Sequence, residues 1–425
     1  MNELPVLTLE ELAAAVAGGA VAIRSVSRLQ PAGGPGDKVF PPTYAQDANK
    51  LKYAMETRRM DGAEVPTVLL DSVASQANRM EEALQRAWDE ERLSFPVVSV
   101  DFSGLAGLED LDRITSLQAP HRLADALLRD SVDEAGTPFR ETAVGRAFTD
   151  ANPKSATAVW ASCPTALIFG VWDSTGPKGG LGSKFQRALV SEIVGVGAKE
   201  GVKTASRMDP AGIQASVEVY HRKDDHDEWT INPDEAEKKG GKPTPFSRKG
   251  SEGKGKPSAI NHSNVAPSID NLAGGVTFDY AQQTTVLSLP ALRRLRFPDN
   301  TRGERPVGAA RLEGENAART ALAALALAAV AELREQGFDL RSRANLAPEG
   351  PAVLELLHAD GGPPARFRLD ARSAAALVSA ASARAQEAGF EWSREPLRLR
   401  PAPKLAALIR KSRELAGTHD DGDDK

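Results

Sequence analysis

The sequence predicts an α+β fold whose first part follows the ferredoxin-like order β-α-β-β-α-β. Two patterns lead to this prediction. Segments with strand character alternate with segments of helical periodicity over residues 20–220. After Gly308 the composition changes to alanine-rich stretches with helical spacing, which predicts a helix-rich C-terminal region around one hairpin.

The first strand is expected at Ala20–Leu29, where Arg24 and Arg28 share one face. A helix is expected from Asp71, because apolar residues recur at steps of three and four: Val73, Ala77, Met80, Leu84 and Trp88. The opposite stripe of this helix could contact phosphates or base edges through Ser72, Ser75, Gln76 and Arg79. An ordinary solvated helix face explains the same spacing equally well.

The remaining elements complete the predicted order. A strand is expected at Pro96–Phe102, a short helix begins at Pro120, and the uncharged run Thr165–Trp172 is expected to be a strand buried on both faces. A helix follows at Ser183–Gly195, and strict alternation of apolar and polar residues over 213–220 predicts a half-buried strand. RNA-recognition domains share this order. However, aromatic residues make up only 5% of the chain and no strand has the aromatic pattern of those domains, so base stacking on a sheet face is not expected.

A glycine-rich loop joins the expected buried strand to the next helix. Its glycines stand at positions 176, 179, 180 and 182, and Ser183 with Gln186 fits a capping box. The helix start would then direct free backbone amides, together with Lys184 and Arg187, at an anion such as a backbone phosphate. The spacing is not that of a nucleotide-binding P-loop, because Lys184 follows Ser183 where that motif requires glycine. A turn that only reverses the chain is the alternative.

Composition excludes several classes of protein. The chain has 425 residues, of which 41% are hydrophobic, enough for a sizeable core. The single cysteine, Cys163, excludes an internal disulfide, and six scattered histidines give no metal-ligand spacing, so neither a metal nor another cofactor is expected. The longest uncharged apolar stretch lies within Ala321–Ala331, too short to cross a bilayer, and the N-terminus lacks a signal-peptide pattern. We therefore expect a cytoplasmic protein with no membrane partner.

Charge is segregated along the chain, although the net charge is only -5. Lys and Arg outnumber acids by seven to three over residues 21–59, by six to two over 176–207 and by seven to one over 238–256. Residues 80–141 carry fourteen acids against six bases. Because Lys and Arg on phosphates supply most nucleic-acid affinity, the basic segments predict a confined polyanion track, and the acidic window suits a partner-facing surface. Ordinary solvated surface is the alternative for any one segment.

Three parts are expected along the chain: residues 1–300 as the ferredoxin-like domain, 301–418 as a helix-rich C-terminal domain and 419–425 as an acidic tail. Residues 222–268 interrupt the first part with an acidic stretch and then a basic stretch rich in glycine and proline. Such a segment lacks the apolar residues for a core, so we expect it to be flexible until it binds a polyanion. A passive linker is the alternative.

Five strings resemble one protein family in their order along the chain: RLQPAGGPGDKVFPPTY, VLLDSVASQANRMEEAL, APHRLADALLRDS, CPTALIFGVWDSTGPKGGLGSKFQRALVSEIVG and SRMDP. They are similar to the backbone subunit of type I-G (formerly I-U) CRISPR Cascade complexes, in the Cas-seven group of the RAMP superfamily. The resemblance spans about residues 24–290. It implies an RNA-recognition-like palm with finger and thumb insertions, polymerised head to tail along a CRISPR guide RNA, with no catalytic residues.

The resemblance gives the basic and polar residues of these strings a common role as guide-RNA contacts. The candidates are Arg24, Arg28, Lys38, Ser72, Gln76, Arg79, Arg122, Ser183, Lys184, Arg187 and Arg207. The loop 31–44 and a flexible basic loop are the expected finger or thumb elements, the latter with Lys238, Lys239, Lys242, Arg248, Lys249, Lys254 and Lys256. The implied partners are CRISPR guide RNA, target DNA, further copies of the chain, the Cascade large subunit, the fused guide-processing subunit and the recruited helicase-nuclease.

Two other functions stay open from the sequence. An RNA-processing or target-cleaving nuclease would use His121 as a general base, or Asp101 and Asp173 as metal ligands, but the sequence shows neither a positioned partner nor paired carboxylates. An RNA-independent scaffold would dock acidic proteins on its basic loops. Salt dependence separates these possibilities, because RNA binding weakens steeply as salt is added.

Overall fold

The computed structural model describes residues 4–47, 50–248, 253–393 and 395–419, so the acidic tail predicted at 419–425 lies almost entirely outside the described residues. The chain forms two compact units. The first comprises Met1–Tyr44, Tyr53–Lys199 and Val276–Leu408, and the second comprises Ala45–Lys52, Glu200–Gly275 and Ile409–Lys425.

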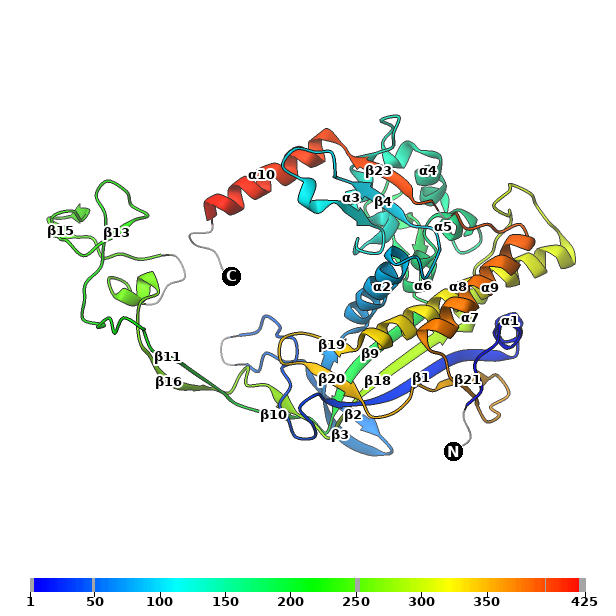
Figure 1. Cartoon of the computed structure of the whole chain (residues 1–425), viewed down its shortest axis with the longest axis horizontal. Coiled ribbons are helices and arrows are strands. Elements are labelled where there is room, and N and C mark those ends of the chain that lie inside the picture. The colour runs from blue at the N-terminus through cyan, green and yellow to red at the C-terminus, as the bar shows by residue number, and fades with distance from the viewer. Residues whose placement is uncertain (1–3, 48–49, 249–252, 394, 420–425) are drawn as a thin grey trace. The chain divides into compact units, whose positions relative to one another are not determined.

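An antiparallel sheet organises the first unit (Figure 1). Its central strands are β1 (Ala20–Pro31), β18 (Tyr280–Ser288), β9 (Leu189–Val196) and β3 (Ala63–Asp71), paired in that order. Beyond these, β2 (Met55–Met60) pairs with β3, and the other side holds β19 (Phe338–Asp339), β20 (Asn345–Pro348), β21 (Leu354–His358) and β22 (Ala365–Phe367). Buried and half-buried residues alternate strictly along β18, as expected for a strand with one face in the core.

The sheet contains a β-α-β-β-α-β order, and the α+β class is confirmed. Along the chain this order is β1, α2 (Val73–Asp89), β9, β18, α8 (Gly308–Gln336) and the β20–β21 segment. Strands β2 and β3 come between β1 and α2 and extend the sheet beyond β9, and further elements lie between α2 and β9. In space β18 lies between β1 and β9, and the last segment pairs with the free side of β1. This is the strand arrangement of ferredoxin-like domains.

Several of the predicted elements are nevertheless wrong. The run 165–172 forms α6 (Thr165–Phe169) and β7 (Val171–Trp172), because a fully buried helix has the same uncharged composition as a buried strand. Residues 183–195 form β8 (Lys184–Phe185) and most of β9 instead of a helix, since β9 has paired strands on both sides and its β-branched residues pack in the sheet. Residues 213–220 have strand structure only where β12 (Tyr220–His221) begins.

A smaller sheet of the same unit contains the strand predicted at 96–102. This strand is β4 (Val98–Asp101), which pairs with β5 (Arg113–Thr115) and β23 (Leu397–Pro401), and β23 also pairs with β6 (Ser131–Val132). Short helical segments follow along the chain: η1 (Glu109–Leu111), η2 (Arg122–Ala124), α3 (Ala126–Arg129), η3 (Phe139–Glu141), α4 (Ala143–Asp150), α5 (Thr157–Ser162) and η4 (Gly179–Leu181). The strand was correctly predicted, but it is not part of the main sheet.

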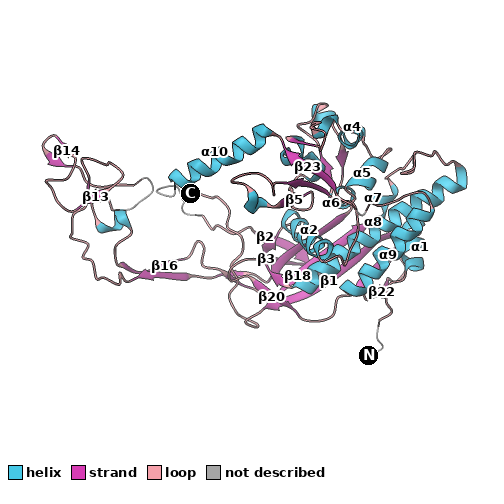
Figure 2. Ribbon diagram, turned by 45° about the horizontal axis from the view of Figure 1, so that its top comes forward, coloured by secondary structure: helices cyan, strands magenta, loops and turns pink. Residues whose placement is uncertain are grey.

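Helices α2 and α8 pack against each other on one face of the main sheet (Figure 2). α9 (Ala371–Glu387) and α1 (Leu9–Ala17) pack on α8, α7 (Leu289–Arg293) follows β18, and α10 (Pro403–His419) ends the described chain. By length and composition α8 could cross a membrane, but 83% of its apolar window is buried inside the structure, as in a core helix. Residues 276–408 complete the first unit, so the boundary expected at residue 300 falls inside it.

The second unit contains a two-stranded ribbon and a small module of short hairpins. The ribbon pairs β11 (Lys203–Arg207) with β16 (Val265–Asp270). The module contains β12 with β13 (Trp229–Thr230), β14 (Lys238–Lys239) with β15 (Lys242–Pro243), and η5 (Pro257–Ile260); the short strands β10 (Lys199–Glu200) and β17 (Val276–Thr277) stand at the borders of the two units along the chain. Val219, Phe246 and Ala259 form a buried cluster, so the prediction that this segment lacks a core is wrong for the described residues. Its flexibility stays a prediction.

A buried polar network joins α2 to the main sheet. The Gln76 side chain is fully buried, and its Nε2 donates to Asp71 Oδ2 at 2.7 Å. Its Oε1 accepts hydrogen bonds from Ser191 Oγ at 3.0 Å and from Gln283 Nε2 at 2.9 Å, and Ser191 also pairs with the Thr285 hydroxyl at 2.8 Å. These residues belong to α2, β3, β9 and β18, so one side chain of α2 binds three strands.

Replacing Gln76 with alanine should lower the free energy of unfolding by about 2–3 kcal/mol, because buried polar groups on three strands lose their partner. Urea denaturation followed by circular dichroism measures this change. Arg86→Ala, at an exposed position of the same helix, is the control and should stay within about 0.5 kcal/mol of the parent. Equal midpoints for Gln76→Ala and the parent would contradict the role of the network.

Candidate nucleic-acid interface

A groove of about 550 Å³ lies on the first unit, between α2, η2 and the β7–β8 hairpin. Its lining combines three cationic side chains with aromatic, small and apolar residues, and it contains no carboxylate. The lining residues are Ala74, Ala77, Asn78, Pro120, His121, Arg122, Phe169, Gly170, Val171, Trp172, Ser174, Lys184, Phe185 and Arg187. A groove with this charge suits an anionic ligand.

A buried ion pair supports the groove. Arg122 is 6% exposed, and its Nε and Nη2 donate to the two carboxylate oxygens of Glu81 on α2, each at 2.6 Å. Its Nη1 donates to the Gly170 carbonyl at 2.9 Å, so Arg122 ties α2 to the segment that leads into β7. Burial raises the pKa of the Glu81 carboxyl to about 7, although Arg122 and Arg187 favour its ionised form.

Trp172 and Lys184 face each other across the β7–β8 hairpin. They are register partners, and Lys184 Nζ lies 4.7 Å from the centroid of the Trp172 ring, within the range of a cation–π interaction. Trp172 is 51% exposed, which is high for so large an apolar side chain. The groove therefore presents an aromatic surface beside a cation.

Gly170 permits the close approach of Arg187 to the groove. Its φ is +85°, in the region that favours glycine. A Cβ at this position would lie 3.1 Å from both the Arg187 backbone nitrogen and the Phe185 carbonyl oxygen. A residue with a side chain at position 170 would therefore displace the segment that holds Arg187.

The glycine-rich loop folds around Asp173 and does not lead into a helix. Asp173 is 1% exposed, and its carboxylate accepts hydrogen bonds from both terminal nitrogens of Arg140. A Cβ at Gly176 would lie 2.1 Å from Asp173 Oδ2, and a Cβ at Gly182 would lie 2.2 Å from its carbonyl oxygen. The capping box predicted at Ser183 is wrong, because β8 follows and Ser183 itself is buried. In the described part of this loop, the predicted helix N-terminus is absent, so it does not supply the expected anion site.

The residues considered for a nuclease have other partners. Asp173 binds Arg140, and hydrogen bonds from Ser103 lower the pKa of Asp101 below its usual value. Among the described residues, no group of three or more His, Cys, Asp or Glu side chains could hold a metal ion. His121 lines the groove next to Arg122. The expectation of a non-catalytic protein stays a prediction.

Arg24 and Arg28 lie on the face of β1 opposite to Ser27, whose hydroxyl accepts a hydrogen bond from Arg334 on α8. Arg24 Nη2 lies 2.6 Å from Glu355 Oε2, and Arg28 Nε lies 3.1 Å from Glu349 Oε2. Arg28 also lies over the Tyr280 ring, at 3.8 Å from its centroid. Because a carboxylate neutralises each of these arginines, this face attracts a polyanion less than the groove does.

The polar stripe predicted on α2 is not a solvent-facing surface. Ser72 caps the helix by accepting a hydrogen bond from the Ser75 amide at 3.2 Å. Gln76 belongs to the buried network, and Arg79 Nε donates to Asp71 Oδ2 at 3.0 Å. These bonds give Ser72, Gln76 and Arg79 structural roles. Gln76 is fully buried and is therefore out of reach of RNA, whereas RNA contacts of the half-buried Ser72 and Arg79 stay a prediction. The side chains that bond α2 to its surroundings are the ones that the helical spacing predicted on its solvent-facing side.

The other candidate contacts are scattered. Lys38 is half-buried in the first unit, away from the groove lining, and Arg207 on β11 of the second unit donates to the Ser263 carbonyl at 3.0 Å. Arg248 lies over the Phe246 ring, at 5.9 Å. The remaining residues of the basic loop are exposed at positions Lys238, Lys239, Lys242, Lys254 and Lys256, and Lys249 lies outside the described residues. Of the eleven predicted contacts, the groove brings together only Arg122, Lys184 and Arg187.

Sequence reasoning missed Trp172 and Asn78 as groove residues. Asn78 stands on the exposed side of α2, one turn from Ala74. Trp172 was assigned to a buried strand, whereas it ends β7 and is half-exposed. A bulky aromatic directly before a polar glycine-rich loop is the signal that could have indicated an exposed position.

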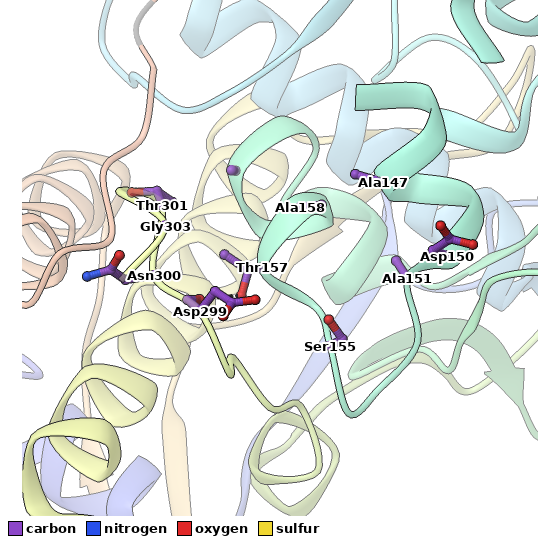
Figure 3. Close-up of a pocket in the computed structure, with 11 residues that line it drawn as sticks. Ala147, Asp150, Ala151, Ser155, Thr157, Ala158, Asp299, Asn300, Thr301 and Gly303 are labelled. Atoms are coloured by element: carbon purple, nitrogen blue, oxygen red, sulfur yellow. Dashed lines mark hydrogen bonds between the residues drawn. The ribbon is translucent and has the colours of Figure 1, made fainter. Parts of the chain in front are cut away.

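A second cavity of about 430 Å³ has a different lining (Figure 3). It lies among α4, α5 and the segment 299–303, where Asp150 and Asp299 line it without a cationic neighbour in the lining. The hydroxyl of Thr157 donates to the Asp299 carbonyl at 2.7 Å. Lys178 pairs with Asp150 and Arg305 pairs with Asp299, so cations outside the lining compensate the charge of both carboxylates.

The fold and the groove define an α+β protein of ferredoxin-like topology with a cationic, carboxylate-free binding groove. Residues 23–200 match the model of the family described as CRISPR-associated protein GSU0053, and this match indicates a CRISPR-associated protein. All residues that line the groove fall inside the matched segment. No curated protein matches the chain.

The raised pKa of Glu81 predicts a pH-dependent stability. Because the folded protein holds this proton more tightly than the unfolded chain, the contribution of Glu81 is full below its ordinary pKa of 4.5 and is lost as pH rises through about 7. Glu81→Gln should remove this part of the pH dependence. The free energy of unfolding of the parent, relative to that of the variant, should therefore fall by about 3 kcal/mol between pH 4.5 and about 7.

Urea denaturation of parent and variant at several pH values measures this difference. Glu82→Gln, at the exposed neighbouring position on α2, is the matched control and should leave the dependence unchanged. Parallel stability curves for the parent and Glu81→Gln would show that Glu81 has an ordinary pKa.

Proposed function

We propose that this chain is the CRISPR RNA-binding backbone subunit of a type I-G Cascade surveillance complex. It polymerises along the guide RNA and supports recognition of target DNA in antiviral defence. The observation that carries the proposal is the carboxylate-free groove, where Lys184 and Arg187 stand together inside the segment that matches a CRISPR-associated family. The chain acts in the cytoplasm, where guide RNA is available.

Most contacts to RNA are made through phosphates and sugars. Most guide bases must stay free to pair with target DNA, so a backbone subunit has to bind without reading sequence. Lys184 and Arg187 are suited to this role because they are exposed, whereas Arg122 is held by Glu81 beneath them. The buried pair therefore orders the groove, and the two exposed cations bind the phosphates.

Further copies of the chain add head to tail, because a heterologous interface that does not close generates a filament. The acidic window 80–141 is the surface proposed to face a neighbouring copy or another subunit. Part of its charge is compensated within the chain, as in the pairs Asp89–Arg113 and Asp130–Lys404. The other partners are the large subunit, the fused guide-processing subunit and the helicase-nuclease.

Removing the two exposed cations of the groove should weaken RNA binding and flatten its salt dependence. Lys184→Ala with Arg187→Ala deletes two phosphate contacts, so the slope of log affinity against log salt should fall by about 1.4 for single-stranded RNA. Fluorescence anisotropy with labelled guide RNA at several salt concentrations measures the slope.

The matched control is Lys154→Ala with Lys178→Ala, which removes the same charge from exposed positions outside the groove lining. This control should keep a slope close to the parent's. If both double variants change the slope equally, the effect reflects net charge and the groove is not the RNA site.

The proposed backbone role is non-catalytic. Guide RNA and its precursor should stay intact when incubated with the chain and Mg²⁺, because the described residues bring no carboxylate cluster together that could hold the metal ions of a nuclease. Denaturing gel electrophoresis measures the products, with a magnesium-free sample as the control. RNA cleavage that requires Mg²⁺, and that follows the chain through successive purification columns, would instead identify a nuclease.

A further inference from the structure

Trp172 is placed differently from the other tryptophans of the first unit. Trp160 is fully buried, and its indole Nε1 donates to the Ala318 carbonyl at 3.0 Å. Trp392 packs beside Trp160, with ring centroids 5.1 Å apart, and Trp88 carries Arg113 over its ring. Trp172 is 51% exposed and lies in the groove. Packing of the core therefore does not explain its exposed half.

The surroundings of Trp172 match the chemistry of a nucleotide. A nucleobase offers a flat apolar face and its phosphate carries negative charge, so a binding site combines an aromatic ring with nearby cations. Lys184 is the register partner of Trp172, and Arg187, three residues later, also lines the groove. Phe169 and Phe185 line the groove but are buried, so Trp172 is its exposed aromatic surface, and no lining residue is acidic.

We propose that Trp172 is a stacking platform for one base of single-stranded RNA, while Lys184 and Arg187 bind the adjoining phosphates. This inference rests on the proposed function, because it names what the same groove recognises. Stacking on a tryptophan tolerates any base, since every base has a π face. The platform therefore adds affinity without introducing sequence preference.

Stacking also predicts a preference for unpaired RNA. A base inside a duplex is already covered on both faces by its neighbours, so its face reaches Trp172 only after unstacking. Phosphate contacts alone would not distinguish the two forms in this way. The groove is thus expected to bind a single strand more tightly than a duplex of equal length.

The test compares an ordinary single-stranded oligonucleotide with one of equal length in which abasic sites replace the bases. Anisotropy is measured for the full chain, for Trp172→Ala and for Trp172→Phe. The parent should bind the base-bearing strand about tenfold more tightly than the abasic strand. Trp172→Ala should lose most of that difference and Trp172→Phe should keep most of it. Trp229→Ala, at an exposed tryptophan of the second unit, is the control.

The outcomes separate this inference from the proposed function. If Trp172→Ala keeps the parent's preference for bases while Lys184→Ala with Arg187→Ala weakens binding, the stacking platform is wrong and the RNA site stands. If the parent binds neither strand at low salt, both proposals are overturned. Because Trp172 lies outside the core, each variant is expected to keep its fold. Circular dichroism checks this.

Discussion

Removing the Arg122 guanidinium from water costs solvation free energy, and in this fold Glu81 and the Gly170 carbonyl meet that cost together. The three groups come from η2, from α2 and from the turn before β7. Losing the Glu81 contact would leave the buried Arg122 charge without its partner, and losing the Gly170 contact would leave a buried donor without an acceptor, so the three segments hold a common geometry. The walls of the groove, and with them the positions of Lys184 and Arg187, depend on this arrangement.

The same helix α2 takes part in two buried polar systems with different purposes. Gln76 binds α2 to the strands of the main sheet, whereas Glu81 binds it to the segments beside the groove. Gln76 and Glu81 are five positions apart on α2. The buried side of this helix contacts both the main sheet and the segments beside the groove. The main sheet thus supports α2, and the candidate interface lies beside this helix, where loops and short strands can present cations.

The sequence predicted the fold class, the first strand, helix α2 and the basic residues beside the glycine loop. It failed where burial was complete, because the uncharged run 165–172 has no periodicity that separates a helix from a strand. The predicted solvent-facing stripe on α2 was wrong for a related reason: Gln76 and Arg79 look like surface residues by type, but long-range partners hold them in the structure. Trp172 was missed because exposure of an aromatic residue depends on tertiary packing, which single-sequence patterns do not contain.

The strand order has a consequence for how this protein can be divided. The segment 23–200 contains most of β1 and all of α2 and β9, but the strand that lies between β1 and β9 is β18, at 280–288. A fragment cut to the limits of that segment would leave two inner strands with unpaired edges and would also lose α8 from above the sheet. Such a truncated chain is prone to aggregate, whereas an excision confined to 202–274 would leave every strand of the main sheet in place.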